Sequence, residues 1–517
     1  MNLRDSLSVG PSVRWLLSSL LLIALLAIIA LHFGLVDVGQ WTSDEFAILN
    51  SYRDKSWVAF WDRLTGWSPR PLSEALIWTY ASVVNLARKP FIGVFLGSLW
   101  LMLILTPLIS LAQVRTRFYS DSQNLSLFLL LLPYELIALF LLQHTPGALF
   151  YWPVGAAAYL TTLVALTLCF FQLAYNLAES RCGRTISSLS LILAAGSSET
   201  GAFFAIVFGC LSLVGTVVDR LAGAAHKRKY LWYLTPAFLG IGVFALLLHN
   251  RARTQEALFP TVEYHNIYVS LQTAVGETLK EYLVPGHRLS TRGLFLGLIL
   301  KACFFLAVRY CWLSSNIKKP RRQVLIVFGL SLIATTYVSV TASYYGYGGL
   351  TNPWHEEFRQ CLIMIIVATM GVFSCHFSPK QRNIQTVEWL GVVFILTTLL
   401  LVAPRRWAAL AHDYKNYSVC IENRHKSWKS GLSEGNTMVW YSPPKGQVAD
   451  TLIFFPGAYD LGVKASDDLD YSHIMQFFCK KHLEIRPYVP KQNCSTACRW
   501  SKARKAWTNR NRGRKWR

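Results

Sequence analysis

The sequence is dominated by long apolar runs, each close to the length that a helix needs to cross a lipid bilayer. Crossing takes roughly 20 apolar residues, and every backbone amide must be hydrogen-bonded within the segment. The runs lie at 13-34, 91-113, 125-143, 154-177, 186-196 with 199-218, 230-249, 292-313, 323-344, 359-377 and 386-403. With 53% hydrophobic and only 15% charged residues, the composition excludes an ordinary soluble globule. The sequence therefore predicts an all-α polytopic membrane protein.

The basic residues of the short loops predict how these spans are oriented. They are Arg4, Arg14, Arg115, Arg117, Arg181, Arg184, the run His226-Lys227-Arg228-Lys229, Lys318, Lys319, Arg321, Arg322, Lys380 and Arg382. Lys and Arg accumulate on the cytoplasmic side of a membrane. All of these residues reach that side only if 72-87 lies in plane on the outer surface and 186-196 reaches the outer leaflet before 199-218 returns.

This topology has about 11 transmembrane helices with in-plane juxtamembrane helices. It places the chain in the cytoplasmic (inner) membrane, with the N-terminus cytoplasmic and the C-terminus extracytoplasmic. The loops at 144-153, 250-291 and 345-358 then share the outer face with everything after about residue 404.

Composition divides the chain into a transmembrane domain at 1-403, a small extracytoplasmic domain at 404-490 and a basic tail at 491-517 that we expect to be disordered. In the small domain, Val439-Trp440-Tyr441 and Leu452-Ile453-Phe454-Phe455 are typical of short strands. The net charge of +23 is concentrated in the tail and at the ends of the spans. This distribution favours contact with membrane lipids, and we expect no nucleic acid partner.

Two adjacent carboxylates, Asp44 and Glu45, follow the first span. A carboxylate at this boundary can act as a general base towards an acceptor hydroxyl, or as a ligand for a divalent cation that is bound to a phosphate. The alternative is a solvated loop acid at the top of a helix.

Three further residues stand where a substrate would meet the outer ends of the spans. Arg70 lies between two prolines, where it can grip phosphate oxygens or simply contact lipid headgroups. Trp152 opens a span beside small residues, so it can stack on a sugar ring or belong to an interfacial aromatic belt. Glu199 stands where the 186-196 and 199-218 segments break, and a break at membrane depth suggests a cavity residue.

The 345-359 segment gathers Gly, aromatic, acidic and basic residues at one helix entrance. Arg359 can hold a lipid-linked phosphate there. His355 is a candidate substrate-binding residue, although a histidine in such a place more often caps a helix or is solvated. His355-Glu356-Glu357 is no zinc-protease signature, because no second His follows at helical spacing.

Four short motifs together resemble the GT-C superfamily of integral-membrane glycosyltransferases, and in particular a poorly characterised bacterial branch. They are Ser43-Asp44-Glu45, Arg70-Pro71-Leu72, Tyr151-Trp152-Pro153-Val154-Gly155 and Glu199-Thr200-Gly201. The resemblance covers roughly 13-403 and implies a polyprenyl-phosphate-linked sugar donor and a glycan, lipid or protein acceptor. It implies Asp44 as the catalytic base or metal-linked acid, with Glu45 as its helper. A Mg or Mn cation would then be the only cofactor, with Asp44 as its ligand.

Two other classes stay open. An O-antigen polymerase or ligase is organised around arginines in large outer loops, and Arg251, Arg253, Arg288 and Arg292 border such a loop. A transporter or flippase usually carries ionisable residues within several spans, and these are nearly absent here.

Overall fold

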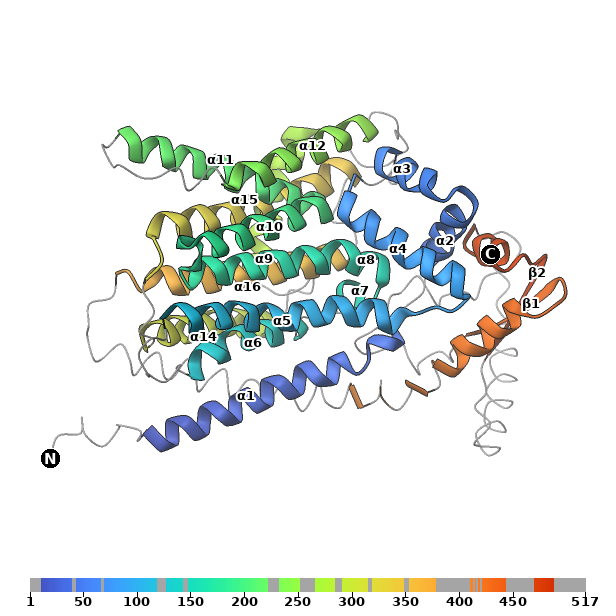
Figure 1. The fold of residues 1–517 in the computed structure, drawn as a ribbon, viewed down its shortest axis with the longest axis horizontal. Coiled ribbons are helices and arrows are strands. Elements are labelled where there is room, and N and C mark those ends of the chain that lie inside the picture. The colour runs from blue at the N-terminus through green and yellow to red at the C-terminus, as the bar shows by residue number, and fades with distance from the viewer. Residues whose placement is uncertain are drawn as a thin grey trace.

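The computed structural model describes residues 11–39, 43–66, 69–118, 127–142, 147–221, 232–251, 266–283, 291–314, 319–347, 353–377, 410–411, 414, 417–418, 421–442 and 469–487. Most of these residues are helical. The long helices lie side by side in a bundle whose axis is horizontal in Figure 1. They are α1 (Pro11–Phe33), α5 (Ile92–Phe118), α6 (Leu127–Leu141), α9 (Thr161–Ala174), α10 (Arg181–Ser197), α11 (Glu199–Leu221), α12 (Leu234–Arg251), α14 (Thr291–Ser314), α15 (Arg322–Tyr347) and α16 (Pro353–Ser374).

Six helical segments of the described chain are long and apolar enough to cross a membrane, which confirms an all-α multi-pass membrane protein. These segments are Ser18–Val38, Ile92–Arg115, Pro153–Ala174, Glu199–Val218, Arg322–Tyr345 and His355–Ser374. Leu131–Leu141 and Leu234–Leu247 are shorter apolar helices. The predicted span at 386-403 lies outside the described residues, so the count of about 11 stays a prediction.

The helices at the centre of the bundle are buried, and the outer helices expose apolar side chains. The Pro153–Ala174 segment is 89% buried and the His355–Ser374 segment 78%, against 39% for Ile92–Arg115. Exposed leucines and valines cover the outer helices, as in Leu213 and Val214 of α11. An apolar outer face of this kind suits contact with acyl chains better than contact with water.

The helix predicted to break near Glu199 does break there. Ser198 is extended, with φ −152° and ψ 157°, and its hydroxyl accepts a hydrogen bond from Gly201 N at 3.0 Å, which caps α11. The first half of the pair is longer than predicted, because α10 begins at Arg181, where Ser180 caps it by accepting from Gly183 N.

The two halves pack closely, and Gly201 allows this. A Cβ on Gly201 would lie 2.1 Å from the carbonyl oxygen of Ala194 in α10. We therefore expect Gly201→Ala to destabilise the protein by about 1–3 kcal/mol, because the backbones must separate. Unfolding in detergent measures this effect. Gly242→Ala is the control, since a Cβ there meets no atom within 4 Å, and equal midpoints for the two variants would contradict the expectation.

Short elements cover the end of the bundle opposite the N-terminus (Figure 1). They are η1 (Val36–Val38), α2 (Ser43–Lys55), α3 (Trp57–Gly66), α4 (Pro71–Ala87), α7 (Gly147–Phe150), α8 (Pro153–Gly155) and the π-turn η2 (Ala156–Leu160). The predicted helix at 72-87 is α4, which starts at Pro71. A proline suits the first helical position, because its missing N–H would have no partner within the helix. The remaining short helices are η3 (Leu177–Glu179) and α13 (Ile267–Leu283).

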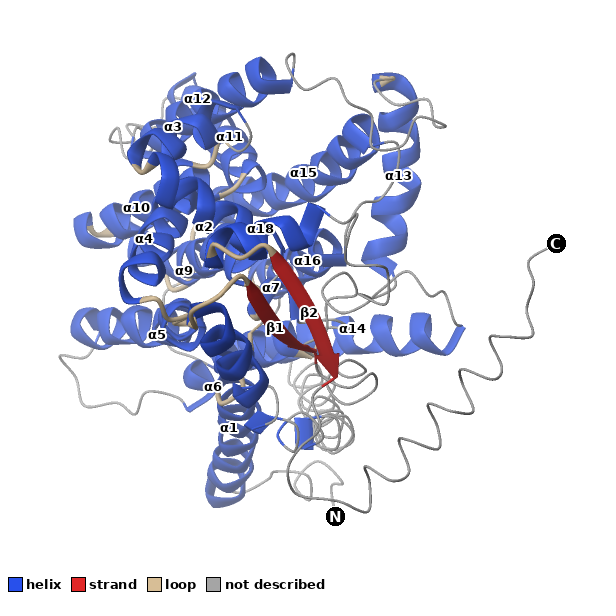
Figure 2. Cartoon of the chain, turned by 90° about the vertical axis from the view of Figure 1, so that its right-hand side faces the viewer, coloured by secondary structure: helices blue, strands red, loops and turns tan. Residues whose placement is uncertain are grey.

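The described C-terminal elements pack against α2. A helix at 421–432, α18 (Leu469–Phe478) and the parallel strands β1 (Thr437–Ser442) and β2 (His482–Pro487) lie at this end of the molecule (Figure 2). The strand predicted at Val439-Trp440-Tyr441 is confirmed as part of β1, which pairs from Thr437↔His482 to Ser442↔Pro487. The strand predicted at 452-455, the boundary at 403 and the tail at 491-517 lie outside the described residues.

A shared aromatic cluster joins these elements to the membrane part. The Phe46 ring of α2 lies 5.5 Å from Phe477, 6.0 Å from Phe478, 6.1 Å from Trp428 and 5.9 Å from Trp440, measured between ring centroids. Aromatic pairs at such distances contribute about 0.5–1.5 kcal/mol each beyond their burial. The described part of the predicted C-terminal domain therefore shares a core with α2.

Candidate functional site

Three of the predicted binding residues meet around one tyrosine. Arg70 Nε donates to Glu199 Oε2 at 2.7 Å, and Arg70 Nη2 donates to the Tyr159 hydroxyl at 3.3 Å. That hydroxyl also lies 3.3 Å from His355 Nε2. Residues up to 285 positions apart in sequence are thus linked in one polar cluster, which we call the Tyr159 cluster.

Three members of the Tyr159 cluster stand at the start of a helix. Arg70 is the residue before α4, Glu199 begins α11, and His355 lies in the first turn of α16. Tyr159 belongs to the one-turn π-helix η2 between α8 and α9, and such π-helical turns are frequent at functional sites. The starts of α4, α11 and α16 therefore meet here beside the end of α10, and their positive dipole ends favour an anionic group.

Arg70 is held as a permanent cation that is still reachable from outside. Burial opposes its charge, but Glu199, Tyr159 and Glu74 together outweigh this effect and raise the pKa of Arg70 above its ordinary value. Its guanidinium also lies 5.4 Å from the centre of the Tyr159 ring, within range of a cation–π contact. The side chains of Arg70 and Glu199 remain 22% and 23% exposed, so a ligand can approach them.

Arg359 lies beside the Tyr159 cluster but has a carboxylate partner. Its Nε donates to Glu281 Oε2 at 2.8 Å and its Nη2 donates to Glu281 Oε1 at 2.6 Å. Its side chain is 2% exposed. Glu281 therefore takes the Nε and Nη2 donors of Arg359, and a contact between Arg359 and a phosphate stays a prediction.

Trp152 is buried at the turn before α8. It is 7% exposed, so it does not belong to a lipid-facing aromatic belt, and its contact with a sugar stays a prediction. The neighbouring aromatic residues are equally internal: the Tyr151 hydroxyl donates to the carbonyl oxygen of His32 at 3.0 Å, and Trp100 Nε1 donates to the carbonyl oxygen of Phe150 at 2.9 Å. This turn packs the core that supports Tyr159.

The acidic pair begins α2 at the same end of the bundle. Asp44 lies in the first turn of the helix, and its side chain is outside the described part of the structure. Glu45 is 2% exposed, so it is no solvated loop acid. Since α2 packs against α4, which starts directly after Arg70, the pair and the Tyr159 cluster belong to one end of the molecule.

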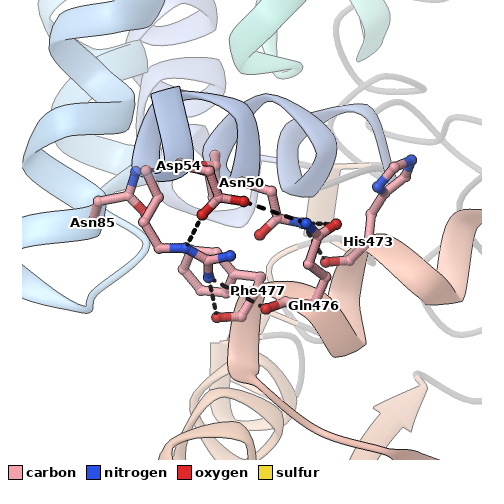
Figure 3. A network of polar contacts seen from close by, with 8 residues as sticks. Asn50, Asp54, Asn85, His473, Gln476 and Phe477 are labelled. Atoms are coloured by element: carbon pink, nitrogen blue, oxygen red, sulfur yellow. Dashed lines mark hydrogen bonds and ion pairs between the residues drawn. The ribbon is translucent and has the colours of Figure 1, made fainter. Parts of the chain in front are cut away.

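Polar contacts with α18 fix the position of α2 (Figure 3). Asn50 Nδ2 donates to the carbonyl oxygen of His473 at 2.8 Å, and Gln476 Nε2 donates to Asp54 Oδ2 at 3.3 Å. From the other side, Asn85 Nδ2 of α4 donates to the carbonyl oxygen of Leu49 at 3.0 Å. The helix that carries the acidic pair is therefore held from two directions.

Sequence reasoning missed a second ion pair beneath α4. Arg63 donates to both oxygens of Glu74, from Nε at 2.7 Å and from Nη2 at 3.1 Å, and the Tyr52 hydroxyl donates to Glu74 Oε2 at 3.2 Å. Burial and then Glu74 raise the pKa of Tyr52 above its ordinary value, so it remains a donor. The sequence signal that could have predicted this ion pair was Glu74, an acidic residue in the first turn of an apolar helix. Tyr159, the centre of the main cluster, belongs to the aromatic segment that begins at Tyr151, from which only Trp152 was chosen as a site residue.

A divalent cation has no complete site among the described residues. No group of three or more His, Cys, Asp or Glu side chains there is arranged to hold one. The side chain of the expected ligand Asp44 lies outside the described residues, so a Mg or Mn ion bound through Asp44 stays a prediction.

Comparison with protein-family models and with curated proteins finds no match for this chain. Function must therefore be inferred from the geometry of the site.

Proposed function

We propose that this protein is a membrane glycosyltransferase that moves a sugar from a polyprenyl-phosphate carrier to a hydroxyl of a glycan, lipid or protein. In this reaction Asp44 takes the proton of the acceptor hydroxyl, whose oxygen forms a bond to the anomeric carbon with inversion. The bond from that carbon to the phosphate oxygen breaks, and polyprenyl phosphate leaves. No step requires a metal ion.

The observation that carries the proposal is the Tyr159 cluster. A leaving phosphate gains negative charge, so it needs cations and dipoles already aimed at it. Arg70 supplies a fixed guanidinium whose Nε faces Glu199, and the starts of α4, α11 and α16 add N-terminal dipole charge. Tyr159 is buried, and its hydroxyl holds Arg70 and lies beside His355 on the inner side of this anion site.

The distribution of cations supports an outer-face location in the cytoplasmic membrane, with the N-terminus inside and the C-terminus outside. At the end of α16 opposite His355, three cations donate to backbone carbonyls: Arg309 to Ser374, Lys319 to Cys375 and Arg322 to His376. The positive-inside rule assigns this end to the cytoplasm. The Tyr159 cluster then faces the outer side, where lipid-linked sugars meet acceptors.

A transfer assay tests the proposal. Purified protein in vesicles receives a polyprenyl-phosphate-linked sugar and a pool of envelope acceptors, and released polyprenyl phosphate is counted. We expect Arg70→Gln to lower kcat/KM by about tenfold to a hundredfold, because an interaction with a charged phosphate is worth about 1.5–3 kcal/mol.

Arg63→Gln is the matched control, because it breaks a neighbouring buried ion pair without removing a member of the Tyr159 cluster. Both variants must reach the membrane in equal amounts. A wild-type protein that releases no polyprenyl phosphate from any donor, or an Arg70→Gln variant as active as Arg63→Gln, would contradict the proposal.

A further inference from the structure

A polar hollow lies at the cation-rich end of the bundle, away from the Tyr159 cluster. It is lined by residues of η3, α10 and the start of α15, among them Glu179, Arg184 and Arg321. Arg184 Nη1 donates to the carbonyl oxygen of Glu179 at 2.9 Å. Its Nε is shielded from solvent and has no hydrogen-bond acceptor among the described residues.

An apolar hollow adjoins the polar one. It lies between α11 and α15, where Phe208, Gly215 and Val327 line it. Tyr233 and Val324 line both hollows, so the two share a wall. On the same helix α11, Val214 and Val218 are 58% and 56% exposed.

We propose that these two hollows together bind one anionic glycerophospholipid of the surrounding leaflet, with the phosphate between Arg184 and Arg321 and an acyl chain in the groove between α11 and α15. A free phosphate would leave the apolar hollow unfilled. A phospholipid would fill both hollows, with its headgroup in the polar one and an acyl chain in the apolar one. Basic pockets between membrane helices are suited to such headgroups.

The charges of the polar hollow favour an anion despite one carboxylate. Arg321 Nε donates to Glu179 Oε1 at 2.9 Å, so this pair is neutral and leaves Arg184 as the net positive charge. A guanidinium has five N–H donors, and Arg184 commits Nη1 to a backbone carbonyl. The Arg184 side chain lines the hollow, so its guanidinium charge attracts the phosphate of a headgroup there.

Lipid retention tests the inference independently of any transferase activity. The protein is reconstituted in vesicles of equal parts phosphatidylcholine and phosphatidylglycerol, extracted into detergent and examined by native mass spectrometry. We expect one retained phosphatidylglycerol per chain. The double variant Arg184→Gln/Arg321→Gln should retain at least about tenfold less, because it removes both charged donors.

Two matched controls separate this site from general attraction. Arg115→Gln/Arg181→Gln removes the same charge from the same end, outside both hollows, and should retain the lipid. The second control fills the apolar hollow with a larger side chain. A Cβ at Gly215 or at Gly242 of α12 meets no atom within 4 Å, so neither Gly215→Phe nor Gly242→Phe clashes at the Cβ. Gly215→Phe should lose the lipid, whereas Gly242→Phe should retain it.

Three outcomes would overturn the inference. They are equal retention of phosphatidylcholine and phosphatidylglycerol, equal loss in the Arg184/Arg321 and Arg115/Arg181 variants, and displacement of the lipid by inorganic phosphate with no effect of Gly215→Phe. The last would mean a site for free phosphate.

Discussion

Replacing Asp44 with asparagine is expected to lower the rate of sugar transfer by about a hundredfold to ten-thousandfold, the usual worth of a positioned general base. The substitution keeps the shape of the side chain but removes its ability to take the acceptor proton. The KM for the donor should stay nearly constant, because Asp44 is proposed to act on the acceptor hydroxyl and not on the phosphate. Initial rates at saturating donor measure this loss.

Glu45→Gln is the internal comparison for this prediction. Glu45 is 2% exposed within the same helical turn, so we expect a smaller loss of rate, through positioning of α2. A different result would favour the O-antigen polymerase or ligase hypothesis over the one proposed here. In that result, Asp44→Asn keeps full activity while Arg251→Gln or Arg288→Gln abolishes it.

The second large effect concerns stability. Arg359→Met is expected to lower the free energy of unfolding by about 3–5 kcal/mol, because it leaves the buried Glu281 carboxylate without its partner. The double variant Arg359→Met/Glu281→Leu should recover most of this loss, since apolar residues of similar volume can replace a buried ion pair at little cost. Denaturation of the detergent-solubilised protein, followed by tryptophan fluorescence, measures both.

The same double variant shows whether Arg359 also acts in the reaction. A stable double variant with full transfer activity would assign Arg359 a structural role alone, whereas a stable but inactive one would support the predicted phosphate contact. Arg486→Met serves as the control, because its bidentate pair with Glu484 is half exposed and should not change the unfolding midpoint. A similar loss of stability in Arg486→Met and Arg359→Met would contradict the prediction.

Features that depend on local sequence were predictable. An apolar run of bilayer length can only become a helix in lipid, so the membrane class follows from the letters alone. The break before Glu199 and the start of α4 at Pro71 are equally local, because a cap or a proline acts on its own turn. For the same reason Arg70, Glu199 and His355 could be chosen one at a time, as polar residues at the entrances of apolar segments.

What joins these residues was decided by packing over long separations in the chain. Glu199 lies 129 positions from Arg70, and His355 lies 196 positions from Tyr159, so no periodicity relates them. Tyr159 looks like any interfacial tyrosine until α9 brings its hydroxyl between Arg70 and His355. Glu281 forms an ion pair with Arg359 because α13 and α16 pack together. Trp152 is buried by the core around it. The apolar runs are enough to predict a multi-pass membrane protein, because their length is a local property of the chain. Which polar groups meet depends on packing, because the burial of each group requires partners that are remote in the chain.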